Sequence, residues 1–258
     1  TGNLNTAVGQ SALGANTTGG YSTAVGASAL LTSTTADSNT AVGYGALYSN
    51  TTGASNAAIG RSALYTNTTG TRNHAIGMGA LQTNTTGSYN SAMGYYTLQL
   101  NTTASYNTAI GDTSLYSNTT GANNTAVGYS ALYTSTTGAS NTAIGFQALD
   151  SNTTGHNNVA VGYAAFNAVN TGGQNVAIGT YAGQTLTTGT YNVYIGYNVN
   201  PSAVGNANEI VIGNGNQTGK GGSTGYISPA GGPMYNGQNS TVWVATSDRR
   251  IKKDIVPN

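Results

Sequence analysis

The sequence has few charged residues, no cysteine and no long apolar run. Only 5% of its 258 residues are charged, against about 25% in ordinary globular proteins. A net charge of +1 gives no field that would attract nucleic acid or anionic lipid. The absence of cysteine excludes disulfides and thiolate metal sites. No run approaches the roughly 20 apolar residues of a membrane helix, so we expect no nucleic-acid binding and no membrane insertion.

A strict internal repeat argues against disorder, which low charge and 38 glycines could otherwise indicate. Glycine follows a Val, Ile or Met at intervals of seventeen residues, thirteen times from Gly9 to Gly213, with no insertion. A fixed period of this length is typical of solenoids and other stacked arrays.

Four further columns keep the same spacing. They are leucine from Leu13 to Leu149, threonine from Thr18 to Thr188, a second glycine from Gly19 to Gly189, and asparagine from Asn5 to Asn192. The segments between turn residues are too short for helices. Glycine and asparagine are expected where turns need positive φ. The sequence therefore predicts an all-β fold, a β-solenoid or β-roll of about 13 coils, each with two short strands and two turns.

Both expected strands are apolar on both faces, because Ala adjoins Val in one and Leu in the other. Neighbouring residues of a strand point to opposite faces. One face can fill the coil, and the other needs a second surface, where the Ala column would permit close approach of another chain. This pattern favours a parallel homo-oligomer, and three-fold symmetry is preferred. A monomeric solenoid is the alternative.

Composition divides the chain into three parts. Residues 1–213 form the repeat shaft, and residues 214–247 are a Gly-rich neck or cap with one short strand in "TVWVAT". The charge density then rises abruptly, since six of the thirteen charged residues lie in residues 248–258. This change predicts a domain boundary near Ser247.

The stretch "TSDRRIKKDI" resembles the junction in phage tail fibres and tailspikes where a C-terminal intramolecular chaperone begins. The resemblance implies that the chaperone trimerises the fibre and is then cut off after Ser247. Ser247 would be the nucleophile, Lys252 its partner, and Asp248 the new N-terminus. Residues 248–258 would be the start of that chaperone, and its body would follow Asn258. Beyond this single self-cleavage we expect no enzyme activity, no cofactor and no metal.

The repeated "NTAVG" is similar to the head repeats of trimeric autotransporter adhesins, which form trimeric left-handed β-rolls with a different period. Both resemblances imply an extracellular trimeric fibre, with the tail fibre of a virion preferred. Its partners would be its own copies and a glycan or protein of the host surface. Two alternatives stay open. One is an ice-binding solenoid, because pairs such as Thr17 and Thr18 recur, and the other is a bacterial surface adhesin or filament.

Candidate site residues are few. The two histidines, His74 and His156, lie in different columns, and the acids of the shaft form no column. Tyrosines recur in the column after the glycine and are candidates for binding a host surface, or for packing the coil edges; they are Tyr44, Tyr95, Tyr129, Tyr163 and Tyr197. The "NTT" turns match the N-glycosylation pattern at Asn16, Asn50, Asn67, Asn84, Asn101, Asn118 and Asn152, and could equally form hydrogen-bonded ladders.

Overall fold

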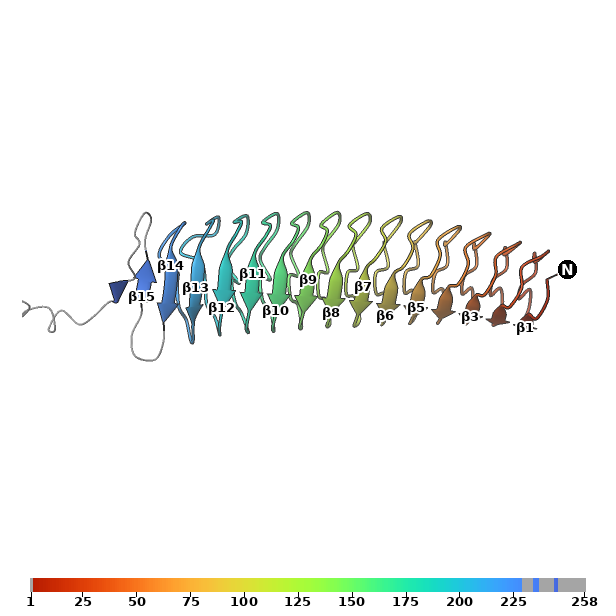
Figure 1. The fold of residues 1–258 in the computed structure, drawn as a ribbon. Helices are drawn as coiled ribbons and strands as arrows, with labels where there is room; N and C mark the ends of the chain where they lie inside the picture. Colours follow the sequence, from red (N-terminus) through yellow and green to blue (C-terminus); the bar gives the residue numbers. More distant parts are fainter. Residues whose placement is uncertain (1, 229–233, 237–243, 246–258) are drawn as a thin grey trace, which may run out of the picture.

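A computed structural model describes residues 2–228, 234–236 and 244–245 of the chain. This part is an all-β solenoid (Figure 1), and it contains no helix. One strand lies on each coil: β1 Thr6–Val8, β2 Thr23–Val25, β3 Thr40–Val42, β4 Ala57–Ile59, β5 His74–Ile76, β6 Ser91–Met93, β7 Thr108–Ile110, β8 Thr125–Val127, β9 Thr142–Ile144, β10 Val159–Val161, β11 Val176–Ile178, β12 Val193–Ile195, β13 Ile210–Gly213, β14 Gly225–Ser228, β15 Met234–Asn236 and β16 Val244–Ala245.

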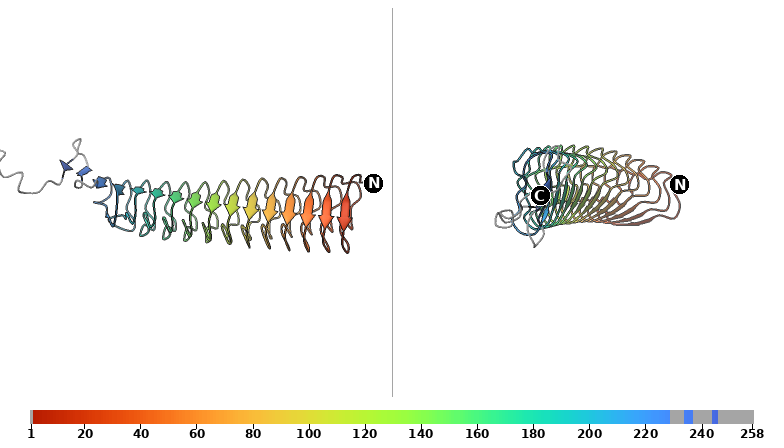
Figure 2. Two further views of the ribbon diagram at one scale, coloured as in Figure 1. Left: turned by 90° about the horizontal axis from the view of Figure 1, so that it is seen from below. Right: turned by 60° about the vertical axis from the view of Figure 1, so that its left-hand side comes forward.

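The strands form a single sheet in sequence order. Neighbours from β1 to β14 are parallel, and β14–β15 and β15–β16 are antiparallel. Residues seventeen apart are partners along the repeat, as in Thr6 with Thr23, and the step shortens to fifteen between Ile210 and Gly225. Figure 2 shows the coils stacked in register, with the strands aligned along one side. The predicted β-solenoid is therefore confirmed.

The prediction of a second strand in each coil is wrong. The Ala-Leu segment consists of consecutive turns, and Leu13 to Leu149 adopt left-handed φ values of 51° to 55°. Such values cost an L-residue roughly 1–2 kcal/mol. They persist because the leucine amides still bond to the next coil, as Leu47 N does to Ala63 O at 3.0 Å, and because Leu30 to Leu149 are fully buried.

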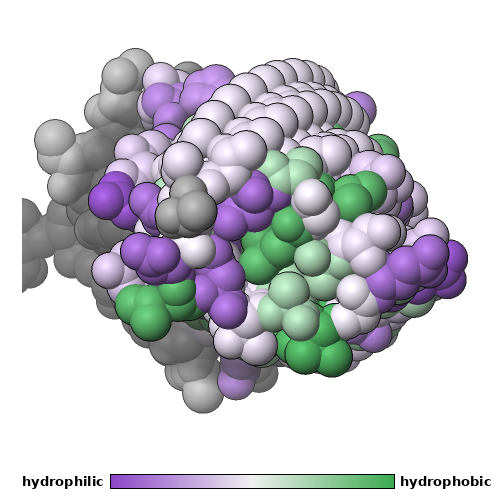
Figure 3. Space-filling view, turned by 90° about the vertical axis from the view of Figure 1, so that its right-hand side faces the viewer, coloured by the Kyte–Doolittle hydropathy of each residue, from purple (hydrophilic) through white to green (hydrophobic). Residues whose placement is uncertain are grey.

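The interior of the coil is narrow and is lined by small residues. From coil two to coil eleven, the middle residue of every strand is a buried alanine, such as Ala58 and Ala126. On the first described coil, Leu4 and Val8 are 75% and 58% exposed. Figure 3 looks onto this end and shows hydrophobic atoms at its centre.

The sequence-based assignment of the Ala column to the outer face is corrected by the same burial pattern. The alanines point inward, and the Val, Ile and Met side chains that follow them point outward. Two asparagine ladders share the interior with these alanines and with the buried leucines. The strand is still apolar on both faces, as predicted.

The two columns require glycine for different reasons. Gly9 to Gly196 have φ between 121° and 140°, a region that is essentially restricted to glycine. This column matches the predicted positive φ. Glycines of the second column, such as Gly70, lack positive φ, but a Cβ on Gly70 would lie 2.3 Å from Gly87 O. The second column therefore allows coils to approach closely.

The sequence predicts left-handed turns at the asparagine columns, and this prediction is wrong. The asparagines form buried hydrogen-bonded ladders instead. In the column of Asn39 to Asn192, each side-chain oxygen accepts the backbone N–H of the next asparagine, as Asn56 Oδ1 does from Asn73 N at 2.9 Å. Its Nδ2 group donates to the carbonyl of the second glycine column, as Asn56 does to Gly70 O at 2.8 Å. The amides therefore tie each coil both to itself and to its neighbour.

A second ladder runs through the "NTT" turns. Asn67 Nδ2 donates to Asn50 Oδ1 at 2.8 Å and to Gly70 O at 3.0 Å. The threonine that follows also links coils, since Thr68 Oγ1 donates to Thr85 O at 3.0 Å. The predicted Asn and Thr ladders are thus confirmed.

The second ladder has gaps where the next coil lacks asparagine. Asn16, Asn118 and Asn152 have buried Oδ1 atoms without a hydrogen-bond partner. The residues seventeen positions later are Ser33, Ser135 and Val169. None of these carries an amide that could reach the orphan oxygen, and the hydroxyls of both serines are also unpaired.

Restoring the ladder should stabilise the fold. In Ser135→Asn, the new Nδ2 would donate to Asn118 Oδ1, and the new Oδ1 would accept from Asn152. Because a buried unpaired polar group costs about 1–3 kcal/mol, we expect a gain of about 1–2 kcal/mol in the free energy of unfolding. Chemical denaturation measures it, and Ser117→Asn, at a half-buried turn position outside both ladders, is the matched control. An unchanged or lowered stability would contradict the ladder.

Candidate binding surface

The aromatic residues singled out from the sequence all lie at the surface. Tyr44, Tyr95, Tyr129, Tyr163 and Tyr197 are between 44% and 59% exposed. They follow the glycine at the end of each strand, so the turn at that glycine brings them onto one side of the shaft. The strict period places their backbones one above another, as expected.

Where the column is unbroken, the rings stack. Tyr129 and Phe146 have ring centroids 5.3 Å apart, and Phe146 and Tyr163 lie 5.1 Å apart, with interplanar angles of 13° and 6°. Tyr44 and Tyr197 lie outside this stack, because non-aromatic residues separate them from the next ring of their column. The surface thus offers one three-ring platform and several isolated rings.

Two other columns add short stacks. Tyr48 and Tyr65 lie 4.8 Å apart, and Tyr116 and Tyr133 lie 5.2 Å apart. At another edge of the coil, the rings of Tyr89 and Tyr106 are 5.0 Å apart. The rings shield the coil edges here, which fits the packing role that the sequence also allowed.

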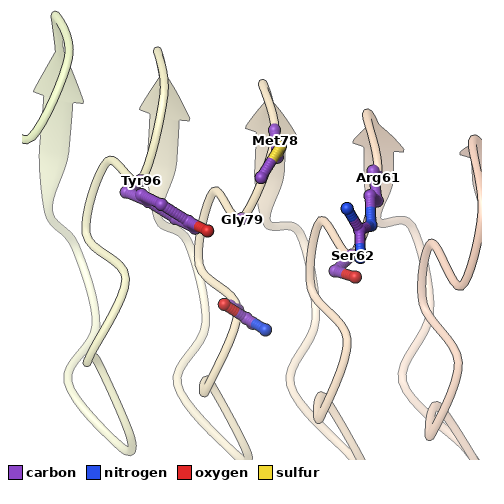
Figure 4. Close-up of a pocket in the computed structure, with 6 residues that line it drawn as sticks. Arg61, Ser62, Met78, Gly79 and Tyr96 are labelled. Carbon is purple, nitrogen blue, oxygen red and sulfur yellow. The ribbon is translucent and has the colours of Figure 1, made fainter.

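A shallow pocket interrupts the aromatic column. It is lined by Arg61, Ser62, Met78, Gly79, Gln82 and Tyr96, and its volume is about 100 Å³. The labelled residues come from three successive coils (Figure 4). Sequence reasoning missed this site, although Arg61 is the one cation in the column after the glycine, which was an available signal.

The outer face of the sheet carries a continuous row of apolar side chains, called the apolar row below. It consists of the third residue of each strand in β1–β13, from Val8 to Ile212. Its side chains are exposed or half-buried, with Met93 at 48% and Ile178 at 42%. From β10 onward the first strand residue is apolar too; these residues are Val159, Val176, Val193 and Ile210. Over β12–β14, the face contains a shallow depression of about 380 Å³.

The paired threonines occupy two different environments. In the first column the hydroxyls are used within the fold, as Thr51 Oγ1 bonds to Thr68 O at 3.0 Å. In the second column, Thr18 to Thr188 are exposed. One exposed row of threonine therefore remains at the turn, and the recurring Thr pairs do not form a flat two-column face.

The glycosylation pattern falls on buried groups. Asn50, Asn67, Asn84, Asn101, Asn118 and Asn152 are fully buried, and Asn16 is half-buried. Each Nδ2 donates to a backbone carbonyl, as Asn16 does to Gly19 O at 3.0 Å. The folded chain therefore leaves these amides no room for a glycan.

The remaining titratable residues do not converge. His74 lies on β5 and His156 in the loop before β10, and no group of three or more potential metal ligands occurs within the described parts of the chain. Asp112 is used by the fold, since it accepts the Tyr95 N–H at 2.8 Å.

One buried carboxylate was not anticipated. Glu209 takes the asparagine position of its coil and is fully buried. It accepts hydrogen bonds from Tyr194 Oη at 3.1 Å, Ser202 Oγ at 3.0 Å and Gly221 N at 2.9 Å. Burial, and then the nearby Glu209 charge, raise the pKa of Tyr194 well above its usual range. The phenol therefore stays protonated and caps the last regular coil.

The predicted junction residues Ser247, Asp248 and Lys252 lie outside the described residues. The part of the chain that the structure describes holds no helix with the length and hydrophobicity of a membrane span. No family model, curated protein or solved structure matches the chain.

Proposed function

We propose that this chain forms the shaft of a trimeric extracellular fibre, a tail fibre of a virion, that attaches to a host surface. The apolar row carries the proposal. A soluble solenoid has no need of thirteen consecutive Val, Ile or Met side chains facing water, since exposed apolar stripes of this extent mark interaction surfaces.

The occupant we propose for this row is two further copies of the same chain. A copy has the same period and therefore matches the row coil by coil, as a symmetric oligomer requires. Three sheets around a parallel axis would bury their apolar rows together. The second apolar column from Val159 to Ile210 would make this packing tightest near the C-terminal end of the shaft.

The outward-facing surface would then serve attachment. With the sheet at the axis, the aromatic column and the pocket beside it lie past the strand ends, on a neighbouring side of the coil. The resemblance of "TSDRRIKKDI" to the chaperone junction of tail fibres supports the same assignment, with self-cleavage between Ser247 and Asp248 as its further consequence.

Sedimentation analysis tests the oligomer. We expect a particle of three times the chain mass of 25.8 kDa. Ile178→Lys should convert it to monomer, because three like charges would be buried at the axis. Thr154→Lys, on the exposed threonine column, is the matched control and should remain trimeric. A monomeric parent chain would refute the proposal, and a trimer insensitive to Ile178→Lys would place the interface elsewhere.

A further inference from the structure

The pocket beside the aromatic column contains a cation that the fold does not use. The shaft has only two arginines. Arg72 lies 5.2 Å from the ring centroid of Tyr89 and bonds to its hydroxyl. The Arg61 backbone carbonyl accepts the Gly79 N–H at 3.0 Å, but its guanidinium has no hydrogen-bond, ion-pair or cation–π partner in residues 2–228. In a chain with 5% charged residues, its guanidinium is a distinctive free donor group.

The other free polar groups of the pocket are also donors. Gln82 uses its side-chain oxygen to accept from Gln99 Nε2 at 2.8 Å, so its own Nε2 group stays available. The Ser62 hydroxyl likewise has no partner within the described ranges. No carboxylate lines the pocket. This donor set favours an anion with two oxygens, which a guanidinium binds in a bidentate manner.

Gly79 creates the hollow and positions its aromatic wall. A Cβ on Gly79 would lie 2.3 Å from a ring carbon of Tyr96, so the ring covers the bare backbone. The adjacent Tyr95 ring has its centroid 4.1 Å from that of Tyr96. An aromatic and thioether wall next to an arginine suits a ligand with an apolar C–H face as well as a charge.

The pocket is large enough to hold only the edge of one sugar ring, and not a whole ligand. About 100 Å³ is well below the roughly 300–1,000 Å³ of pockets that enclose a drug-sized molecule. Coils are spaced by about 4.8 Å, which is close to the length of a pyranose unit. A sugar chain could therefore place one residue in the pocket and continue along the column that holds Tyr44 and Tyr95.

We propose that this pocket binds the carboxylate of an acidic saccharide residue. Arg61 pairs with the carboxylate, Ser62 and Gln82 donate to its oxygens or to neighbouring hydroxyls, and the Tyr96 ring carries the sugar face. This rests on the proposed function, because it names the ligand class of the attachment surface. The pocket lies within a single chain, so its binding can be measured whatever the oligomeric state proves to be.

Titration calorimetry with matched saccharides tests the site. The probes are 3′-sialyllactose against lactose, and trigalacturonate against its methyl ester. We expect at least one acid to bind and its neutral partner to bind about tenfold or more weakly, as the loss of a charged hydrogen bond predicts. Arg61→Gln should weaken binding about tenfold, and Arg72→Gln should leave it unchanged.

Three results would overturn the proposal. They are no binding of either acid, equal binding of acid and neutral partner, or equal loss in Arg61→Gln and Arg72→Gln. Competition by inorganic phosphate at equal concentration would also refute it, because it would indicate a site for any anion. Sedimentation of the same samples separates these results from a failure of the trimer.

Discussion

Replacement of Asn84 by aspartate should lower the free energy of unfolding by about 4 kcal/mol or more. Asn84 Nδ2 donates to Asn67 Oδ1 at 2.7 Å and to Gly87 O at 2.9 Å. A carboxylate of the same shape would replace this donor by an acceptor oxygen that faces both of these oxygens. It would also place a charge at a fully buried position, where an unpaired charge costs about 3–5 kcal/mol.

Acid should reverse part of this loss. Protonation of the introduced carboxyl removes the charge and restores one donor, so the variant should gain stability relative to the parent as pH falls. Denaturation followed by circular dichroism at pH 7 and pH 3 measures both effects. Asn123→Asp is the control, because Asn123 is exposed at the coil edge, and its cost should stay within about 0.5 kcal/mol. Equal losses for the two variants would contradict the buried ladder.

The two glycine columns should respond very differently to alanine. Gly145 has φ of 135°, and a Cβ there would lie 2.3 Å from Gly162 O. Gly145→Ala therefore combines backbone strain with a clash against backbone, and we expect a loss above about 4 kcal/mol or failure to fold.

Gly138→Ala, in the second column, provides the comparison. Its Cβ would lie 2.6 Å from Gly155 O without a positive φ, and the same column already holds alanine at Ala36 and Ala104. We expect a loss of about 1–2 kcal/mol. Thermal unfolding of both variants measures the difference. Similar losses would show that close approach, and not φ, controls both columns.

The seventeen-residue period, the all-β solenoid and the apolar character of both strand faces could be predicted from the sequence. The single sheet could not, because the Ala-Leu segment resembles a second strand and forms turns instead. The face of the alanines could not, because alternation alone does not say which side is inside. The left-handed leucines could not be predicted either. L-residues avoid that region, and only the closure of a seventeen-residue coil, repeated in Leu47 and its equivalents, imposes it.

The candidate site also has parts that the sequence could predict and parts that it could not. Tyr129 and Tyr163 were found because a column of one residue type is visible in the sequence. The pocket was not, because Arg61 and Tyr96 are 35 positions apart and only the stacking of three coils joins them. The burial of Glu209 was not anticipated, although a charged residue in an asparagine column was the signal.

The asparagine ladders also determine how such a molecule can change in evolution. Along the column of Asn39 to Asn192, each coil presents the same amide oxygen to its successor and accepts the same backbone N–H in return. Duplication or deletion of one seventeen-residue block would therefore leave each junction chemically unaltered. The length of the rod can therefore change with the number of repeated segments, while the contacts between neighbouring coils stay the same.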